Sequence, residues 1–225
     1  MELIPDDVLE ESAVVANCTM NRQRSLRGSN GYDVELRFDP MDYVVQASEH
    51  APVRWLDLCC GSATALGEAA TIIAEKNLPV EIVGVDLVGM FAVPSNGNLT
   101  LITASLNDWE PDEPFDLITC VHGLHYLGDK LGVLASIRSW LKKRGRFAAN
   151  LDMGNIKVVG RKTSRAVSRW LRETGFDIST QHKLITCNSG GNKPSPFEYL
   201  GADDQAGPNY TGQPVVDSHY RIKDL

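Results

Sequence analysis

An acidic residue in the middle of the chain has the position of a ribose-binding carboxylate. Asp57 lies near the end of the apolar run VRWLDL, and Asp86 ends a second run, VEIVGVD. A carboxylate at the end of a second strand, about 25 residues past a strand-to-helix turn, is placed to accept both hydroxyls of a ribose. The turn itself, at Gly61–Ala63, consists of small residues that let the backbone approach a ligand. The pattern predicts a site for a ribose-containing cofactor.

The turn LDLCCGSATAL lacks the glycines that a pyrophosphate requires. A dinucleotide site favours the pattern G-x-G-x-x-G, of which this turn has only Gly61. A nicotinamide dinucleotide is therefore disfavoured. S-adenosylmethionine contains a ribose and an adenine but no phosphate, so it needs an acidic residue and a close backbone approach. The residues favour this second kind of cofactor.

The adjacent cysteines of this turn are interpreted as part of a backbone bend. Adjacent cysteines lack both good disulfide geometry and the further ligands of a metal site. The chain has five cysteines, an odd number without C-x-x-C spacing, which predicts neither a disulfide framework nor a bound metal. They are Cys18, Cys59, Cys60, Cys120 and Cys187.

Composition is that of an ordinary globular protein. The chain has 225 residues, 43% hydrophobic and 23% charged, which predicts one α/β domain with additions. Its formal net charge of -7 disfavours nucleic acid and anionic membranes as partners. The cluster of Arg22, Arg24 and Arg27 is too small to offset the overall negative charge. These arginines are interpreted as a solvated helix face or as contacts to a small acidic ligand.

The N-terminal segment, MELIPDDVLEES, is acidic and lacks the basic and apolar regions of a signal peptide. The later sequence contains no run of about eighteen apolar residues, which is the length that a helix needs to span a bilayer. A cytoplasmic location without membrane association is expected.

Short β-branched runs alternate with helical segments through the centre of the chain. Such alternation implies a mainly parallel sheet with helices on both faces, whose ligand lies beyond the carboxyl ends of the strands. The predicted fold is a Rossmann-like α/β fold with a seven-stranded sheet and a helical N-terminal cap. Strands are predicted at 53–58, 80–85, 99–103, 115–121, 146–151 and 176–187, edge strands at 197–200 and 218–225, and helices at 63–75, 129–143 and 164–174.

Three parts are expected along the chain. Residues 1–50 are predicted to form a helical cap or lid, and residues 51–187 a cofactor-binding core. Residues 188–225, which are rich in Gly, Pro, Asn and Asp, are expected to complete the edge of the sheet. They are also a candidate wall for an acceptor pocket.

Five segments follow one another in a characteristic order: VRWLDLCCGSATAL, EIVGVDL, LTLITASLNDW, FDLITCVHGLHYL and LKKRGRFAANLD. Together they resemble a class I S-adenosylmethionine-dependent methyltransferase of the small-molecule type. The likeness covers residues 52–151, with a continuation to Cys187. It implies S-adenosylmethionine as the cofactor, and methyl transfer to oxygen, nitrogen or carbon of a small organic acceptor.

The resemblance implies roles for residues of the first turn and of the N-terminal cap. Asp57 corresponds to the acidic residue of the family's first motif. Cys59 and Gly61, like Ala63, stand where the family often has glycines. Tyr32 is the candidate for binding the carboxylate of the cofactor. Arg37 and Arg24 are candidate charge partners for that carboxylate or for an acidic acceptor.

The resemblance also implies an adenosine site at the ends of the next strands. Asp86 corresponds to the ribose-binding acid, and Leu87 to a residue that packs on the adenine. Ser105 stands where many members have an aspartate that faces the adenine amine, and Leu106 supplies a backbone contact. Val121 would lie along the methionine part of the cofactor.

Two histidines follow the fourth predicted strand, in the segment CVHGLHY. Methyl transfer is an in-line displacement at a sulfonium carbon, so it needs positioning, and a base only where the acceptor loses a proton. Histidine side chains titrate near neutrality, which makes His122 and His125 the candidate catalytic residues. For His125, packing with Tyr126 at the start of the next helix is the alternative interpretation.

A catalytically inactive ligand-binding or partner-binding module of the same fold is the alternative function. Departures from the family pattern at Cys59, Ala63 and Ser105 leave it open. Within the resemblance, the absence of an N-P-P-Y-like motif after the fourth strand disfavours methylation of bases or glutamine amides.

Overall fold

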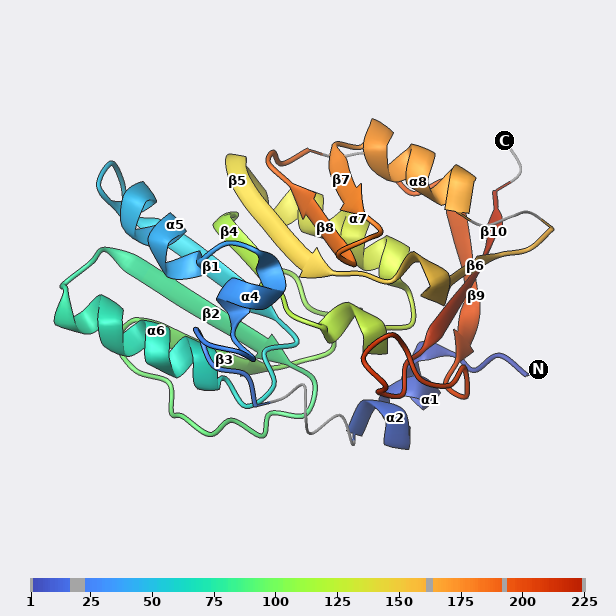
Figure 1. Cartoon of the computed structure of the whole chain (residues 1–225), viewed down its shortest axis with the longest axis horizontal. Coiled ribbons are helices and arrows are strands. Elements are labelled where there is room, and N and C mark those ends of the chain that lie inside the picture. Colours follow the sequence, from blue (N-terminus) through green and yellow to red (C-terminus); the bar gives the residue numbers. More distant parts are fainter. Residues whose placement is uncertain (1, 17–22, 161–163, 192–193, 224–225) are drawn as a thin grey trace.

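The computed structural model describes residues 2–16, 23–160, 164–191 and 194–223. Cys18 and Arg22 lie outside these ranges. The central feature is a seven-stranded sheet with the order β3-β2-β1-β4-β5-β8-β7 (Figure 1). Neighbouring strands from β3 to β5 are parallel, and β8 is antiparallel to both of its neighbours, which confirms the predicted Rossmann-like fold. These strands are β1 Val53–Leu58, β2 Val80–Asp86, β3 Leu99–Thr103, β4 Phe115–Cys120, β5 Leu141–Asn150, β7 Phe176–Ser179 and β8 Leu184–Cys187.

Alternating side chains of β1 belong to two layers of core. Val53 and Trp55 pack with α4, α5 and α6, whereas Leu56 and Leu58 pack with α7. The strands are largely apolar because helices cover both faces of the sheet. Among the described helices, none is long and apolar enough to cross a membrane. The helices are α1 Asp6–Glu10, α2 Ala13–Ala16, α4 Tyr32–Leu36, α5 Pro40–Ser48, α6 Thr64–Glu75, α7 Lys130–Trp140 and α8 Ser164–Glu173, with short 3-10 helices η1 Gly123–Tyr126 and η2 Met153–Asn155.

The helix predicted at 129–143 ends earlier than expected. It ends at Trp140, and β5 begins directly at Leu141, so the basic residues that follow belong to the strand. The predicted end of this helix at residue 143 was therefore wrong. A Cβ at Gly145 would lie 2.8 Å from the carbonyl oxygen of Phe115, so glycine at this position allows β4 and β5 to approach closely.

The C-terminal extension forms a sheet of its own. The predicted strand at 176–187 is a hairpin of β7 and β8, which occupies the edge of the main sheet. The expected edge strands at 197–200 and 218–225 instead form β9 and β10, and β10 pairs with both β9 and β6. The prediction that residues 188–225 complete the main sheet was therefore wrong, because the hairpin already fills that edge. The second sheet consists of β6 Ile156–Val158, β9 Phe197–Asp203 and β10 Asp217–Ile222.

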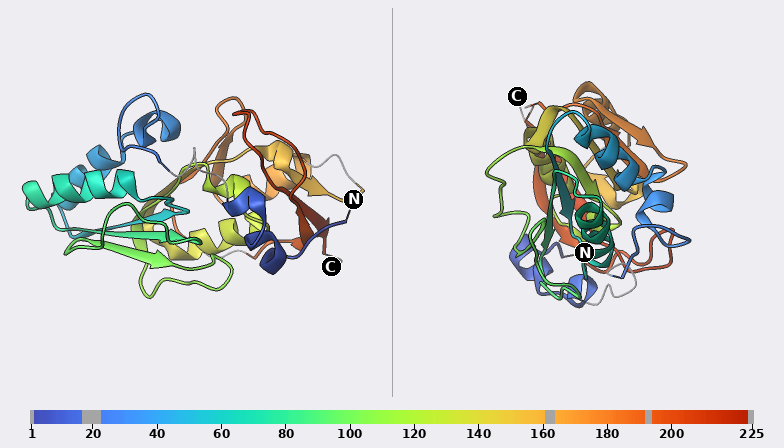
Figure 2. Two further views of the ribbon diagram at one scale, coloured as in Figure 1. Left: turned by 90° about the horizontal axis from the view of Figure 1, so that it is seen from below. Right: turned by 90° about the vertical axis from the view of Figure 1, so that its left-hand side faces the viewer.

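The second sheet lies at one end of the molecule, with the N-terminal segment beside it (Figure 2). Ile4 pairs with Ala202 of β9 through two backbone hydrogen bonds of 2.9 and 2.8 Å. These bonds fix the chain directly before α1. The position of α1 therefore depends on the C-terminal extension.

Lys130 connects the second sheet to the core. Its side chain is fully buried, and Nζ donates to Leu127 O (2.7 Å), Val216 O (2.8 Å) and Ser218 Oγ (2.8 Å). A buried amino group needs such acceptors, because leaving it unpaired is costly. Burial lowers the pKa of Lys130 to about 7. The lysine ties the segment before β10 to the loop that precedes α7.

Candidate active site

The chain leaves β1 in a turn with three left-handed residues. Cys59, Gly61 and Ala63 have φ angles of +54°, +61° and +59°. For a residue with a side chain, this conformation costs on the order of 1 kcal/mol. Backbone hydrogen bonds hold the turn, from Cys60 N to Val85 O (3.1 Å) and from Ala63 N to Cys60 O (3.0 Å). These are the three positions at which the resemblance placed family glycines, and the backbone geometry explains that preference.

The carboxylate of Asp86 joins this turn to the end of β2. Its Oδ2 accepts a hydrogen bond from Gly61 N (2.9 Å), and its Oδ1 accepts one from Val88 N (3.0 Å). The residue is only 6% exposed, and it lines a pocket. Hydrogen bonds from backbone N–H groups to a carboxylate are charge-assisted and comparatively strong. A carboxylate oxygen can accept more than one hydrogen bond, so Asp86 can hold the turn and also bind a ligand hydroxyl.

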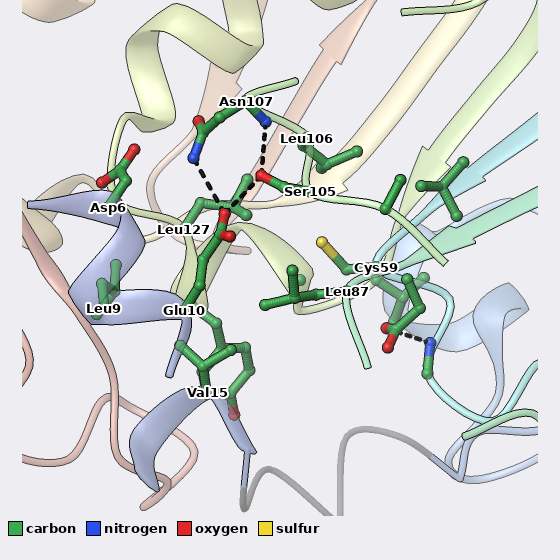
Figure 3. A pocket seen from close by; sticks show the side chains of 18 residues that line it. Asp6, Leu9, Glu10, Val15, Cys59, Leu87, Ser105, Leu106, Asn107 and Leu127 are labelled. Atoms are coloured by element: carbon green, nitrogen blue, oxygen red, sulfur yellow. Dashed lines mark hydrogen bonds between the residues drawn. The ribbon is translucent and has the colours of Figure 1, made fainter. Parts of the chain in front are cut away.

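The pocket has a volume of about 750 Å³, including its opening to solvent, and it lies beyond the ends of the parallel strands (Figure 3). Most of the residues predicted to bind the cofactor line it. They are Cys59, Gly61, Asp86, Leu87, Ser105, Leu106 and Val121.

The pocket also has a wall that the sequence did not predict. Asp6, Leu9 and Glu10 of α1 and Val15 of α2 line it. They meet residues that lie far away in the sequence, and no local pattern encodes such contacts. The acidic segment DDVLEE was the available signal, but charge runs of this kind are usually exposed. Further unpredicted lining residues are Val85, Ala104, Asn107, Gly123, Tyr126, Leu127 and Gly128.

Tyr32 and Asp57 were predicted to bind the cofactor, but they lie outside the pocket wall and bind each other. The Tyr32 hydroxyl donates to Asp57 Oδ2 (2.7 Å), and the Thr119 hydroxyl donates to Asp57 Oδ1. Trp55 Nε1 donates in turn to Thr119 Oγ1 (2.8 Å). Burial raises the pKa of Asp57 to about 7. This buried network attaches α4 to β1.

The two arginines of the cap that were considered as charge partners also lie outside the pocket wall. Arg37 is exposed, and its Nη1 lies 3.0 Å from His182 Nδ1. Arg24 is 8% exposed, and its Nη1 donates to Glu35 Oε1 and Asn30 Oδ1, both at 2.7 Å. Arg24 thus fixes one oxygen of the Glu35 carboxylate.

The second oxygen of Glu35 faces His122. His122 Nε2 lies 2.9 Å from Glu35 Oε2, and the histidine is 1% exposed. The hydrogen bond with His122, together with Arg24, holds the pKa of Glu35 below its ordinary value. His122 has a left-handed φ of +60°, and its neighbours Val121 and Gly123 line the pocket while its own ring does not.

His125 packs beside this pair. The ring centroids of His122 and His125 are 5.5 Å apart, and Tyr210 lies 6.4 and 5.7 Å from them. Burial is the main cause that lowers the pKa of His125 to about 3, so its ring is neutral at pH 7. The histidine cluster is defined here as Arg24, Glu35, His122, His125 and Tyr210.

A family model described as a methyltransferase domain matches residues 32–151, just over half of the chain. The chain belongs to this methyltransferase family. The match runs from α4 to the residue after β5 and includes all of the residues predicted to bind the cofactor except Arg24. The helices α1 and α2 and the second sheet lie outside the match.

Several solved methyltransferase structures resemble parts of the chain. CalS10, an amino pentose methyltransferase from Micromonospora echinaspora, is 20% identical and matches over 54% of this chain and 51% of that chain, with a TM-score of 0.42. The plantazolicin methyltransferase BpumL, in complex with SAH, is 13% identical over 64% and 50%, with a TM-score of 0.43. The sugar N-methyltransferase KedS8, from a Streptoalloteichus species, is 17% identical over 51% and 49%, with a TM-score of 0.39. The chain spans about half the length of these proteins. A comparison with curated protein sequences finds no match.

The pocket fits an adenosine cofactor by its chemistry. Asp86 supplies carboxylate oxygens, and Leu87 and Leu106 supply apolar contact for a ring. A hydrogen bond with Cys120, together with burial, raises the pKa of the Cys59 thiol well above its ordinary value, so Cys59 is a neutral lining residue. Within the described parts of the chain, no group of three or more His, Cys, Asp or Glu side chains is arranged to hold a metal ion.

We expect Asp57 to make the stability of the folded chain depend on pH. Its pKa is about 7 in the folded protein against an ordinary value of 3.8, so the folded state binds more protons between these two values. Stability therefore falls as pH rises from about 4 to about 7, by at most about 1.4 kcal/mol per pH unit. Asp57→Asn removes this contribution.

Urea denaturation at several pH values between 4.5 and 8 measures the effect. The free energy of unfolding of the wild type, minus that of Asp57→Asn, should decrease as the pH rises. Asp177→Asn, at an exposed position of β7, is the matched control and should parallel the wild type. Equal slopes for the wild type and Asp57→Asn contradict the prediction.

Proposed function

We propose that this chain is an S-adenosylmethionine-dependent methyltransferase that acts on oxygen, nitrogen or carbon of a small organic molecule. The observation that carries the proposal is the position of Asp86. Its carboxylate holds Gly61 N and Val88 N and at the same time lines a pocket of about 750 Å³. Membership of the methyltransferase family supports the same cofactor.

The lining residues have complementary roles in this proposal. S-adenosylmethionine supplies a methyl group on a sulfonium sulfur, which a nucleophile displaces in line. Asp86 accepts the hydroxyls of the ribose, while Leu87 and Leu106 enclose the adenine. Gly61 gives the backbone close access, and Val121 lies against the methionine part.

The histidine cluster is the proposed acceptor side of the site. It lies directly behind the segment that lines the pocket through Val121 and Gly123. Where the acceptor must lose a proton, His122 is its general base. Glu35, fixed by Arg24, orients the imidazole. The neutral, fully buried His125 packs against His122 and takes no part in proton transfer in this proposal.

A small acceptor is proposed rather than a nucleic acid because the net charge of -7 repels a polyanion. The described lining of the pocket contains Asp6, Glu10 and Asp86 but no Lys or Arg, so the pocket offers no basic surface to a polyanion.

Calorimetric titration with S-adenosylhomocysteine tests cofactor binding directly. The wild type should bind, and Asp86→Asn should weaken the affinity roughly tenfold to a hundredfold, because hydrogen bonds to a buried charge are lost. Asp86→Glu, which keeps the charge, separates this effect from loosening of the turn, and Asp177→Asn is the matched surface control. A wild type that gives no heat at saturating concentrations contradicts the proposal.

Transfer is tested with S-adenosylmethionine labelled in its methyl group and a fractionated small-molecule extract. The label should appear in a small organic product, which then identifies the acceptor. Binding of the cofactor without transfer of the label to any fraction would instead indicate an inactive ligand-binding module.

For an acceptor that loses a proton, we expect His122→Gln to lower kcat roughly a hundredfold or more while S-adenosylhomocysteine binds as in the wild type. Glu35→Gln should lower kcat roughly tenfold, with partial recovery in Glu35→Asp, because the positioning charge is restored. His182→Gln, at an exposed histidine, is the control. Unchanged kcat and an unchanged pH profile in His122→Gln would remove this residue from catalysis.

A further inference from the structure

One corner of the pocket is polar, and a residue of α1 organises it. Glu10 Oε1 accepts hydrogen bonds from Ser105 Oγ (2.6 Å) and from Asn107 Nδ2 (3.1 Å). The backbone N–H of Asn107 donates to Ser105 Oγ (3.1 Å). Figure 3 shows Glu10 reaching from α1 into the pocket toward these two residues. The polar corner is defined here as Glu10, Ser105 and Asn107.

The polar corner contains a hydrogen-bond acceptor that is available to a ligand. Both hydrogen bonds of the Glu10 carboxylate end on Oε1, and within the described part of the chain Oε2 has no hydrogen-bond partner. The Ser105 hydroxyl proton is already directed to Glu10. A carboxylate accepts hydrogen bonds and donates none, so this corner selects a ligand group that carries N–H or O–H.

Glu10 is held in place by the anchoring of α1. The Tyr199 hydroxyl of β9 donates to Asp6 Oδ1 (2.6 Å), and the preceding Ile4 pairs with Ala202 of the same strand. Leu9 is buried with 2% exposure in a cluster that includes Ala202. Preorganised groups of this kind bind with less loss of entropy than mobile ones.

Glycine at position 128 leaves room for the contact that anchors α1. A Cβ at Gly128 would lie 1.8 Å from Asp6 Oδ1 and 2.4 Å from the Tyr199 hydroxyl, so these two side-chain ends would have to move. The hydrogen bond between Tyr199 and Asp6 therefore fits with glycine at this position.

We propose that Glu10 accepts a hydrogen bond from the 6-amino group of the cofactor's adenine, an inference that rests on the proposed function. Leu87, Leu106 and Leu127 give the pocket the apolar walls that a purine ring requires. The amino group of adenine donates to the free carboxylate oxygen, whereas a 6-oxo purine would present an oxygen to it and be repelled. Glu10 thereby selects adenine among purines, and it does so from a helix outside the family match at residues 32–151.

The test compares two ligands that differ at this one position. Calorimetry measures binding of S-adenosylhomocysteine and of S-inosylhomocysteine, in which an oxo group replaces the amine, to the wild type and to Glu10→Gln. The wild type should prefer the adenine ligand, and the preference should fall roughly tenfold or more in Glu10→Gln, because the amide can donate to the oxo group. Glu11→Gln removes the same charge at the exposed neighbouring residue and should keep the wild-type preference.

The outcomes separate this inference from the proposed function. Binding of S-adenosylhomocysteine by the wild type, with the same ligand preference in wild type and Glu10→Gln, overturns the role of Glu10 and leaves the proposed function intact. No binding of either ligand by the wild type overturns both. Thermal melting establishes that Glu10→Gln is folded. If it is not, Glu10→Asp takes its place: the shorter acid should weaken binding of the adenine ligand, and unchanged affinity overturns the inference.

Discussion

The hydrogen bonds from Gly61 N and Val88 N to the carboxylate of Asp86 join the ends of β1 and β2 through a single side chain. The turn that follows β1 needs this support, because Cys59 and Ala63 adopt a left-handed backbone without being glycine. The same carboxylate lines the pocket, so the group that holds the turn is also the group that we propose binds the ligand. Binding geometry and local stability are therefore coupled, and the rest of the site is arranged around this point.

Segments from both ends of the sequence complete the site around the central sheet. The helix α4 is attached to the sheet through the buried hydrogen bond from Tyr32 to Asp57, and it brings Glu35 to His122. The N-terminal helix α1 is attached to β9, and β10 is linked to the core through the buried Lys130 and its acceptors. The C-terminal extension thus acts on the pocket indirectly, because it fixes the helix that supplies one wall.

The sequence predicted the parts of the fold that depend on local pattern. The apolar runs of β1 to β4 and the small residues of the first turn follow directly from composition and spacing, and so does the acid that ends β2. Two errors arose where tertiary packing decides the outcome: α7 stops at Trp140 because Leu141 pairs with Phe115, and the β7–β8 hairpin fills the sheet edge intended for the extension. Glu10 was missed because its partner Ser105 lies 95 residues away, and only the folded chain brings them together.

A crystal structure of the chain with bound S-adenosylhomocysteine tests the central claim most directly. We expect the adenosine to occupy the pocket beyond β1 to β4, with both ribose hydroxyls within hydrogen-bonding distance of Asp86 and the Gly61 N–H still bonded to that carboxylate. Ligand density elsewhere on the molecule, or a bound ribose that makes no contact with Asp86, would contradict the account.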